Sequence, residues 1–503
     1  MPAMTTREHP RRILFFLSIL GVVAYGGLLI QNLAPGVGSS ESAGHANAAR
    51  AIVSGRIVQP IEALALLELP DRFAPAFIPS SHEPGPRPGT IVPRQAPGFA
   101  LHVALASLIA GWDAGPSIIS PIAAILCLLL LFMLGRELEL SRPFAFAGAA
   151  ILASCPVFLF EAVQPTGDVA CTMWTMASVY FALRSRRRDG WALAAGAALG
   201  MAVLIRPATL LLLLPLAFAL DWRSKTLAKF VVGDLPFAVL FAAWNRAAHG
   251  GVLDFGAAGQ VPGELALANV VPRLRHYAHW LLVQLSPLVP LGWLGVAVDR
   301  RVPARDRAML ILWFAPLLLL FCLRGGPFEE WWHTRVLLPA LPALILGALL
   351  SVRDLVRLLP EPEDRPRLRL PALAALLLLT LVAVAEWRSY SRFRPLEAAK
   401  GEAVIAEASR ALAVRTEGGK AIVVATEFSG ALRYYTEMIP VRWDRITPED
   451  FVLLREKARE KGYRVFAMLL PEEAESARAR APGSWVKIGG GKKAEVWELQ
   501  PGT

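Results

Sequence analysis

The sequence predicts a polytopic α-helical membrane protein with about eleven transmembrane helices and a small C-terminal α/β domain outside the membrane. Two observations support this fold class. The chain of 503 residues is 55% hydrophobic and 18% charged, which is too apolar for a soluble globular protein of this length. Its apolar residues also gather into runs of membrane-spanning character as far as residue 387, and the pattern changes after residue 390.

The first apolar run, residues 13–33, follows Arg11 and Arg12 as the core of a signal peptide would. No A-x-A cleavage site comes after it, and it is long enough to cross a bilayer, so we interpret it as the first transmembrane helix. The further runs of spanning character cover residues 117–138, 143–162, 169–184, 190–205, 208–222, 228–247, 274–297, 307–323, 336–351 and 370–387.

Basic residues lie between these runs in a pattern that orients the chain. With a cytoplasmic N-terminus, every loop predicted to lie inside is basic. These loops contain Arg136, Arg142 and the stretches 184–188, 221–225, 299–307 and 351–370. The outer face then comprises residues 34–116, 163–168, 248–273, 324–335, the turn at Arg206 and everything after about residue 388. Lysine and arginine cluster in loops between apolar runs, where they orient the chain, so the formal net charge of +11 is not taken as a sign of an acidic partner and no nucleic-acid partner is expected.

Residues 97–111 are apolar as well, but a full crossing there would place every later basic loop outside. We therefore predict an interfacial helix that lies along the outer leaflet. The transmembrane domain is then expected to span residues 1–390, and the outer-face loop 34–116 with its interfacial helices belongs to it.

The C-terminal part, residues 391–503, has the pattern of a small α/β domain, because helix-like stretches alternate with short β-rich runs. The predicted helices cover residues 397–413 and 448–462, and the predicted strands cover 421–428, 463–470 and the runs SWVKI and AEVWEL on either side of GGGKK. In the orientation given above, this domain is extracytoplasmic.

An acid follows the first transmembrane helix, in the small-residue stretch VGSSESAGHANAAR of residues 37–50. Ser39 or Ser40 is expected to cap a helix here, which puts Glu41 in the first turn and His45 on the same face. The small residues of this helix would let a substrate or another helix approach closely. The alternative is that Glu41 only complements the helix dipole in a solvated loop.

A second acid, Asp168, lies at an outer-side junction between two predicted helices, just after the breaks at Pro165 and Gly167. It is either a simple helix cap or a group that converges with Glu41 on one cavity. A carboxylate near an apolar boundary is expected to have a raised pKa, which suits a general base that takes a proton from a hydroxyl or an amine.

Two arginines are predicted on the same side as these acids. Arg206 lies at the turn in LIRPATL, and Arg335 lies in EEWWHTRVLLPALP, close to Trp332 and His333. Arginine is suited to bidentate contact with phosphate oxygens, and tryptophan can stack on a sugar. The alternatives are that the arginines anchor the membrane edge and that the tryptophans form an aromatic belt.

These segments resemble motifs of the GT-C polyprenyl-phosphate-sugar glycosyltransferases, which include the protein O-mannosyltransferases and the lipid A aminoarabinose transferases. SESAGHANAARAIVSGRI is similar to the family's D-x-x-x-Y-x-x-x-A…G pattern. The other matching segments are VPRQAPGFALHVALASLIAG, QPTGDVA, GAALGMAVLIRPATLLLLLP and WWHTRVLLPALP, so that the resemblance spans most of residues 1–350.

The resemblance implies that Glu41 takes the place of the family's catalytic aspartate and Asp168 that of its second outer acid. It also implies that Arg206 and Arg335 are ligands of the donor phosphate, and Arg94 stands near the place of a basic residue before the proline motif. The chain departs from the family pattern in having glutamate at 41, histidine at 45 and QAPG without the first proline. In an alternative register, Ser40 aligns with the catalytic aspartate.

The sequence and the resemblance together predict an integral glycosyltransferase of the cytoplasmic (inner) membrane with an extracytoplasmic active site. It would transfer a hexose or pentose from a polyprenyl-phosphate donor to a cell-envelope glycan, lipid or protein, with His45, His333 and Trp332 as further substrate-binding residues. No cofactor or metal site is predicted, and a divalent metal is left open. The alternatives are a multi-pass transporter and a membrane-anchored binding protein without catalysis.

Overall fold

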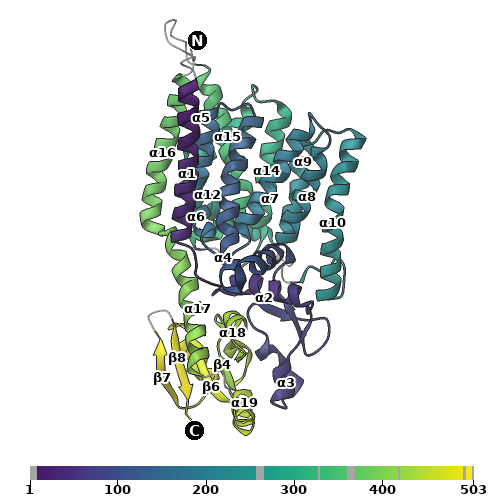
Figure 1. Cartoon of the computed structure of the whole chain (residues 1–503), viewed down its shortest axis with the longest axis vertical. Helices are drawn as coiled ribbons and strands as arrows, with labels where there is room; N and C mark the ends of the chain where they lie inside the picture. Colours follow the sequence, from purple (N-terminus) through teal and green to yellow (C-terminus); the bar gives the residue numbers. More distant parts are fainter. Residues whose placement is uncertain are drawn as a thin grey trace, which may run out of the picture.

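A computed structural model describes residues 8–256, 265–326, 329–358, 369–416, 420–490 and 494–500. Figure 1 shows a bundle of upright helices at one end of the molecule and the C-terminal sheet at the other. The helix α1 (Glu8–Gln31) runs down the bundle toward the sheet, and the chain that follows it forms a layer between the two.

The apolar runs of the sequence form the helices of the bundle. Their inward faces build one apolar core, in which Trp313, Phe144 and Phe158 are fully buried. On the outside of the bundle Val231 and Leu376 are exposed, as expected for side chains that face lipid. The helices after α1 are α4 (Pro97–Glu137), α5 (Arg142–Ser154), α6 (Pro156–Ala162), α7 (Asp168–Ser185), α8 (Trp191–Ile205), α9 (Leu213–Ala219), α10 (Ser224–His249), α12 (Val270–Gln284), α13 (Leu288–Val298), α14 (Ala304–Leu323), α15 (Leu341–Val356) and α16 (Arg369–Phe393).

The predicted count of about eleven membrane spans can be compared with the length and composition of the described helices. In the part of the chain that the structure describes, five helical segments are long and apolar enough to cross a membrane. Two bent pairs, α5 with α6 and α12 with α13, bring the number to seven if each pair is one span. Helices such as α8, with 15 residues, are only about 22 Å long and so fall short of a bilayer core of about 30 Å. The expected count of about eleven therefore remains a prediction.

The basic loops predicted to share one side of the membrane contact one another in the fold. Arg184 forms an ion pair with Glu137 at 2.9 Å, and Arg186 forms one with Asp306 at 2.9 Å. Arg353 donates to the backbone carbonyl of Leu138 at 3.4 Å. These loops therefore lie together at one end of the bundle, which is the end away from the C-terminal sheet (Figure 1).

The helix α4 breaks sharply at Gly111, whose backbone is left-handed (φ 81°, ψ 162°). A Cβ atom at Gly115 would lie 2.4 Å from the Cα of Ser107, so the two parts of α4 fold closely against each other. The first part corresponds to the segment 97–111 for which we predicted an interfacial helix. It forms a separate helical piece below the upright helices, and its position relative to a lipid surface remains a prediction (Figure 1).

The layer below the bundle is built from residues 34–94, and we call it the outer loop. Its main helix is α2 (Ser40–Ser54), followed by the short α3 (Glu62–Leu66). Three short strands form an antiparallel sheet in the order β1-β3-β2, namely β1 (Gln59–Pro60), β2 (His82–Pro84) and β3 (Thr90–Pro93).

The C-terminal region forms a five-stranded mixed sheet in the order β5-β4-β6-β8-β7. The strand β4 is parallel to both its neighbours, and β8 is antiparallel to both of its own. The strands are β4 (Ala421–Val424), β5 (Ile439–Val441), β6 (Arg464–Leu469), β7 (Trp485–Gly490) and β8 (Glu495–Leu499), and the helices are α17 (Ala398–Arg415), α18 (Ser429–Tyr435), α19 (Pro448–Glu460) and α20 (Ala474–Arg480). The strand β4 is buried on both faces, as expected for a central parallel strand.

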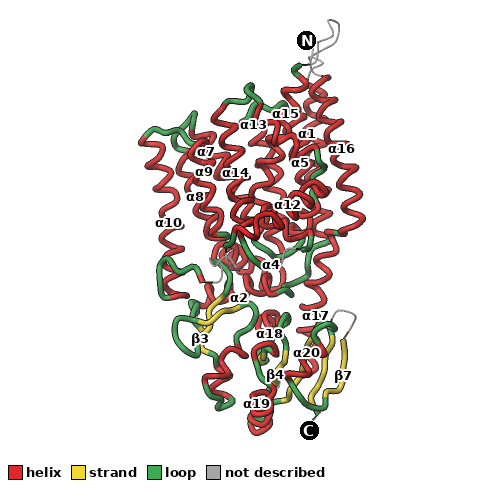
Figure 2. Tube along the Cα trace, turned by 180° about the vertical axis from the view of Figure 1, so that it is seen from behind, coloured by secondary structure: helices red, strands yellow, loops and turns green. Residues whose placement is uncertain are grey.

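The outer loop and the C-terminal region are joined mainly through α18. Both views show α18 between the outer loop and α17 (Figures 1 and 2). Asn47 on α2 donates to the carbonyl of Gly430 at 3.0 Å, and the backbone N–H of Ser80 donates to the hydroxyl of Ser429 at 2.9 Å. The C-terminal region therefore contacts the same helix that carries Glu41.

Candidate active site

The start of α2 directs Glu41 toward the bundle. Ser39 is the N-cap residue, and its hydroxyl accepts a hydrogen bond from the backbone N–H of Ser42. The hydroxyl of Ser40 donates to the carbonyl of Ser80 in the outer loop at 3.1 Å. Glu41, in contrast, forms an ion pair with Arg335 at 2.7 Å. Position 41, and not position 40, therefore faces the arginines.

Asp168 is the first residue of α7 and is fully buried. The helix α6 ends at Ala162, and the chain turns through Pro165 and Gly167 before α7 begins, as the sequence predicted. The carboxylate of Asp168 forms an ion pair with Arg206 and lies 4.0 Å from a second guanidinium, that of Arg335.

The position of Arg206 follows from the proline after it. Pro207 disfavours helical backbone at the preceding residue, and Arg206 is extended (φ −140°, ψ 108°) at the end of α8. Gly98 lets α4 approach this corner, because a Cβ atom there would lie 2.5 Å from the backbone nitrogen of Ile205. The glycine of the QAPG motif is therefore required for close packing beside Arg206.

Arg335 lies in the 3-10 helix η4 (Trp331–Ala340). Two side chains of the bundle hold this segment: Gln284 donates to the hydroxyl of Thr334 at 2.9 Å, and the indole of Trp313 donates to the carbonyl of Pro339 at 2.9 Å. Arg335 can therefore present its guanidinium to the acids from a rigid support.

A third acid, Glu161, belongs to the same cluster and was missed in the sequence. It is fully buried at the end of α6, its carboxylate lies 3.5 Å from the guanidinium of Arg335, and the hydroxyl of Thr166 donates to it. Its spacing of seven residues from Asp168, across the break at Pro165, is a signal that could have identified it. Three carboxylates thus share the guanidiniums of Arg206 and Arg335.

The electrostatics of Glu41 differ from the expectation of a raised pKa. Burial opposes ionisation of Glu41, but the nearby charges of Arg335 and Arg206 outweigh it and lower the pKa of Glu41 to about 2. The expected direction was wrong because the sequence could not indicate how close these two cations lie. In this state of the protein Glu41 is an ionised, ion-paired carboxylate with its side chain 24% exposed.

His45 lies one turn after Glu41 and is 4% exposed. Its ring meets that of Phe99 edge-on, with 4.8 Å between the centroids. Burial lowers the pKa of His45 to about 4, and Arg206 and Arg335 act in the same direction. His45 is therefore a neutral, packed side chain next to Glu41, and its role in substrate binding stays a prediction.

Among the described residues, no hydrogen bond or ion pair joins the side chains of the other predicted binding residues to the acid cluster. Arg94 is exposed, and no described acid forms an ion pair with it. The ring of His333 accepts a hydrogen bond from the backbone N–H of Glu330, and Trp332 stacks on Phe160. Among the described residues, no group of three or more His, Cys, Asp or Glu side chains is arranged to hold a metal ion.

Comparison with known proteins adds an independent finding. Residues 94–244 match the protein family described as dolichyl-phosphate-mannose-protein mannosyltransferase. This segment contains Asp168, Glu161 and Arg206. A comparison with curated proteins gives no match.

Among solved structures, the fold is similar to ArnT from Cupriavidus metallidurans bound to undecaprenyl phosphate, with a TM-score of 0.56, 14% identity and coverage of 96% of this chain and 98% of that chain. It is also similar to the Archaeoglobus fulgidus oligosaccharyltransferase tethered with an acceptor peptide. That match has a TM-score of 0.55 and 13% identity, and it covers 97% of this chain and 74% of that chain. The arabinofuranosyltransferase AftD from Mycobacteria matches with a TM-score of 0.50 and 14% identity, and the match covers 95% of this chain and 41% of that chain. The predicted resemblance to the GT-C polyprenyl-phosphate-sugar glycosyltransferases is therefore confirmed, by the family match in the middle of the chain and by a fold shared over nearly all of it.

Proposed function

We propose that this protein is a membrane glycosyltransferase that transfers a sugar from a polyprenyl-phosphate donor to an acceptor on the outer face of the cytoplasmic membrane. The observation that supports this most directly is the contact between Glu41 and Arg335 beside the pair of Asp168 and Arg206. It joins a partly exposed carboxylate, which can act as a base, to guanidiniums that can bind a phosphate.

The proposed orientation has the N-terminus and the basic loops in the cytoplasm and the acid cluster outside. It is supported by the contacts among the basic loops at the end of the bundle away from α2. About eleven transmembrane helices and an extracytoplasmic C-terminal domain of residues 391–503 are part of the same proposal. A reporter that is active only in the periplasm, fused after Thr503, tests it, and activity of a cytoplasmic reporter alone at that position would contradict it.

In the mechanism we propose, the donor phosphate takes the place of Glu41 beside Arg335. The released Glu41 carboxylate accepts the proton of the acceptor hydroxyl or amine, whose lone pair then forms a bond to the anomeric carbon. The bond between that carbon and the phosphate oxygen breaks, and the electron pair leaves with the lipid phosphate. Attack opposite the leaving group inverts the anomeric centre. Arg335 and Arg206 stabilise the charge that develops on the phosphate.

Asp168 has a different task from Glu41 in this proposal. Because it is fully buried and ion-paired with Arg206, it cannot reach a water-borne acceptor, and it instead holds the guanidinium in position. Glu161 holds Arg335 in the same way. The transfer needs no energy source besides the donor, which fits a chain without a P-loop or G-x-G-x-x-G motif.

A secondary transporter is less well supported. Such a protein is expected to bind its substrate near the middle of the membrane, between discontinuous helices. Here Glu41 lies on α2, in the layer below the bundle. A binding protein without catalysis would not require a partly exposed carboxylate next to two arginines.

The test is a transfer assay with membranes that contain the full chain and radiolabelled undecaprenyl-phosphate hexoses and pentoses. We expect one donor class to lose its label to an acceptor fraction and to release undecaprenyl phosphate, and the Glu41→Gln variant to do neither. Absence of transfer from every donor to envelope glycan, lipid and protein fractions, with the wild-type chain folded, would contradict the proposal.

A further inference from the structure

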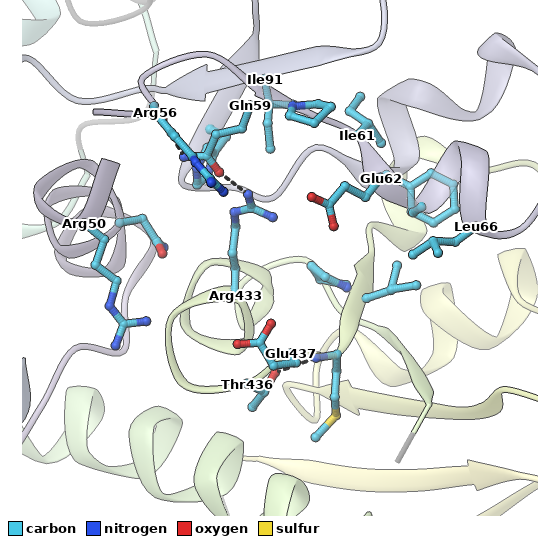
Figure 3. Close-up of a pocket in the computed structure, with 18 of the residues that line it drawn as sticks. Arg50, Arg56, Gln59, Ile61, Glu62, Leu66, Ile91, Arg433, Thr436 and Glu437 are labelled. Carbon is cyan, nitrogen blue, oxygen red and sulfur yellow. Dashed lines mark hydrogen bonds between the residues drawn. The ribbon is translucent and has the colours of Figure 1, made fainter. Parts of the chain in front are cut away.

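A cavity of about 530 Å³ lies between the outer loop and the C-terminal region, and the proposed transfer does not use it (Figure 3). Its walls come from three parts of the chain: α2 contributes Asn47 and Arg50, the segment around β1 contributes Gln59, and α18 contributes Arg433. Its volume is within the range of pockets that bind small molecules.

This cavity is separate from the acid cluster. Arg50 follows Glu41 by nine residues, which is two and a half helical turns, so the two side chains leave opposite faces of α2. The contacts agree, because Glu41 meets Arg335 whereas the guanidinium of Arg50 lies 3.9 Å from the ring centre of Tyr434. Along the helix axis the two residues are roughly 13 Å apart.

The first unusual feature of the cavity is Arg433. Figure 3 shows its side chain extending from α18 between Gln59 and Glu62. Its guanidinium donates to the amide oxygen of Gln59, and no carboxylate of the described residues lies within ion-pair distance of it. A guanidinium has five N–H donors, and most of those of Arg433 have no acceptor among the described residues, so they can bind a ligand. Burial lowers the pKa of Arg433, and the negative charges of Glu62 and Glu437 offset only part of this effect.

The second feature is His82, which lines the same cavity and is 4% exposed. Its Nδ1 pairs with the hydroxyl of Ser81 at 2.8 Å, whereas its Nε2 is buried and has no hydrogen-bond partner among the described residues. Burial, and the charge of Arg433 after it, lower the pKa of His82, so the ring is neutral. An unpaired buried nitrogen is unfavourable unless a ligand group completes its hydrogen bonding.

The remaining lining favours one ligand class. The cationic side chains of Arg50, Arg56, Arg433 and Lys420 outnumber the acidic side chains of Glu62 and Glu437, which suits a ligand with one acidic group. The two carboxylates can accept hydrogen bonds from several hydroxyls. The ring of Tyr463 also lines the cavity and offers an apolar face to a sugar ring.

We propose that this cavity binds an acidic saccharide, with its carboxylate or phosphate at Arg433 and its hydroxyls at Glu62, Glu437 and Gln59. Uronates and sugar phosphates share this chemistry. The proposal goes beyond the glycosyltransferase function and does not rest on it, because the site lies on the other face of α2 and binding needs no donor.

Binding is tested by isothermal titration of the full chain in detergent with D-glucuronate, with glucose 6-phosphate and with glucose. We expect saturable binding of at least one acidic sugar, at least about tenfold tighter than that of glucose, because glucose cannot form the charge-assisted contact with Arg433. The comparison of the two acids identifies which acidic group fits.

Two variants locate the site. Arg433→Gln should weaken binding of the acidic sugar by about tenfold or more, and the exposed Arg56→Gln should weaken it less while leaving thermal stability unchanged. Arg459→Gln, at an exposed position on α19, is the matched control and should change nothing.

The proposal is overturned if the wild-type chain binds no acidic sugar, if glucose binds equally well, or if folded Arg433→Gln and Arg56→Gln proteins both keep wild-type affinity. It is also overturned if Arg335→Ala removes binding, because the ligand would then occupy the acid cluster. Loss of transferase activity has no bearing on these outcomes, so failure here and failure of the proposed transfer can be told apart.

Discussion

The starts of α2 and α7 present the same sequence feature in two different environments. Each helix has an acid in its first turn, after a stretch of small or helix-breaking residues, and each acid contacts an arginine. The side chain of Glu41 is 24% exposed, whereas that of Asp168 is fully buried. In the mechanism we propose, this difference in exposure separates the acid that can reach an acceptor from the acid that holds its neighbours.

The comparison also shows how differently the two acids are supported. The ion-pair partners of Asp168 among the described residues, Arg206 at the end of α8 and Arg335 in η4, both belong to the bundle. The loop before Glu41 is held from the C-terminal region, because the carboxylate of Glu402 on α17 accepts hydrogen bonds from the backbone N–H of Ser39 at 2.9 Å and from the hydroxyl of Ser42 at 2.6 Å. A Cβ atom at Gly38 would lie 2.5 Å from the backbone oxygen of Glu402, so this contact is close. The geometry of α2 thus depends on a segment far away in sequence.

The largest expected effect is on Glu41. Replacing it with glutamine keeps its shape but removes the ability to accept a proton, so transfer should fall by about 10²–10⁴-fold with little change in donor binding. Single-turnover rates of the purified variant measure this, and Glu68→Gln, which removes another outer-loop acid, is the control. If Asp168→Asn abolishes transfer while Glu41→Gln stays within about threefold of wild type, Asp168 is the better candidate for the base. The register that aligns Ser40 with the family's catalytic aspartate is then favoured.

The next effect concerns the buried pair. Arg206→Ala leaves the carboxylate of Asp168 without its nearest cation, and we expect a loss of about 3 kcal/mol in stability, the lower end of the usual range because Arg206 is 21% exposed. Thermal unfolding in detergent measures it. The double variant Arg206→Ala with Asp168→Asn should recover much of the loss. Equal stability of wild type and Arg206→Ala would show that the pair is not structural.

Arg335 should affect the donor more than the fold. Arg335→Ala is expected to weaken binding of a polyprenyl-phosphate donor by about 1.5–3 kcal/mol through the lost charge-assisted hydrogen bonds. Arg335→Lys should restore only part of the affinity, because lysine cannot form the bidentate contact. Equilibrium binding of a fluorescent undecaprenyl-phosphate analogue tests both variants. Unchanged affinity in each would favour the alternative that Arg335 only anchors the chain at the membrane edge.

A smaller effect is expected at Glu402. The change Glu402→Gln disturbs the hydrogen bonds to Ser39 and Ser42, and a slightly misplaced Glu41 should lower kcat by roughly tenfold while donor affinity is kept. Glu407→Gln, at an exposed position of the same helix, is the matched control. If both variants have wild-type kcat, the hydrogen bonds of Glu402 do not position α2 for transfer.

The smallest effect concerns pH. The pKa of Glu41 in the folded protein is about 2, below its ordinary value of 4.5, so the residue is ionised throughout the working range. Its contribution to stability is present above pH 4.5 and is lost as the pH falls through about 2. The pH profile of kcat/KM between pH 5 and 8, which reports the free enzyme, should therefore show no acidic limb from Glu41. A limb in this range that disappears in Glu41→Gln would contradict the low pKa.

Much of the site could be predicted because its parts are encoded locally. The serines before Glu41, the breaks before Asp168 and the proline after Arg206 each determine where a helix starts or ends, and such signals are read from a few neighbouring residues. The same holds for four strands of the C-terminal sheet, β4, β6, β7 and β8, which lie where the β-rich runs predicted them. The short helices α18 and α20 and the strand β5 were not predicted, because they carry too few residues for a periodic pattern.

The sequence by itself determined which residues open helices on one side of a helical bundle, because caps, breaks and apolar periodicity act over one or two turns. Only the tertiary structure decided that Glu41 and Glu161 share Arg335. It also decided that Asp168 is fully buried in an ion pair with Arg206, and that Glu402 holds the loop before α2 by hydrogen bonds. These properties depend on distances between segments up to about 360 residues apart. The charge on a carboxylate is set by burial and by the cations within a few ångströms, and neither quantity is a property of its neighbours in sequence.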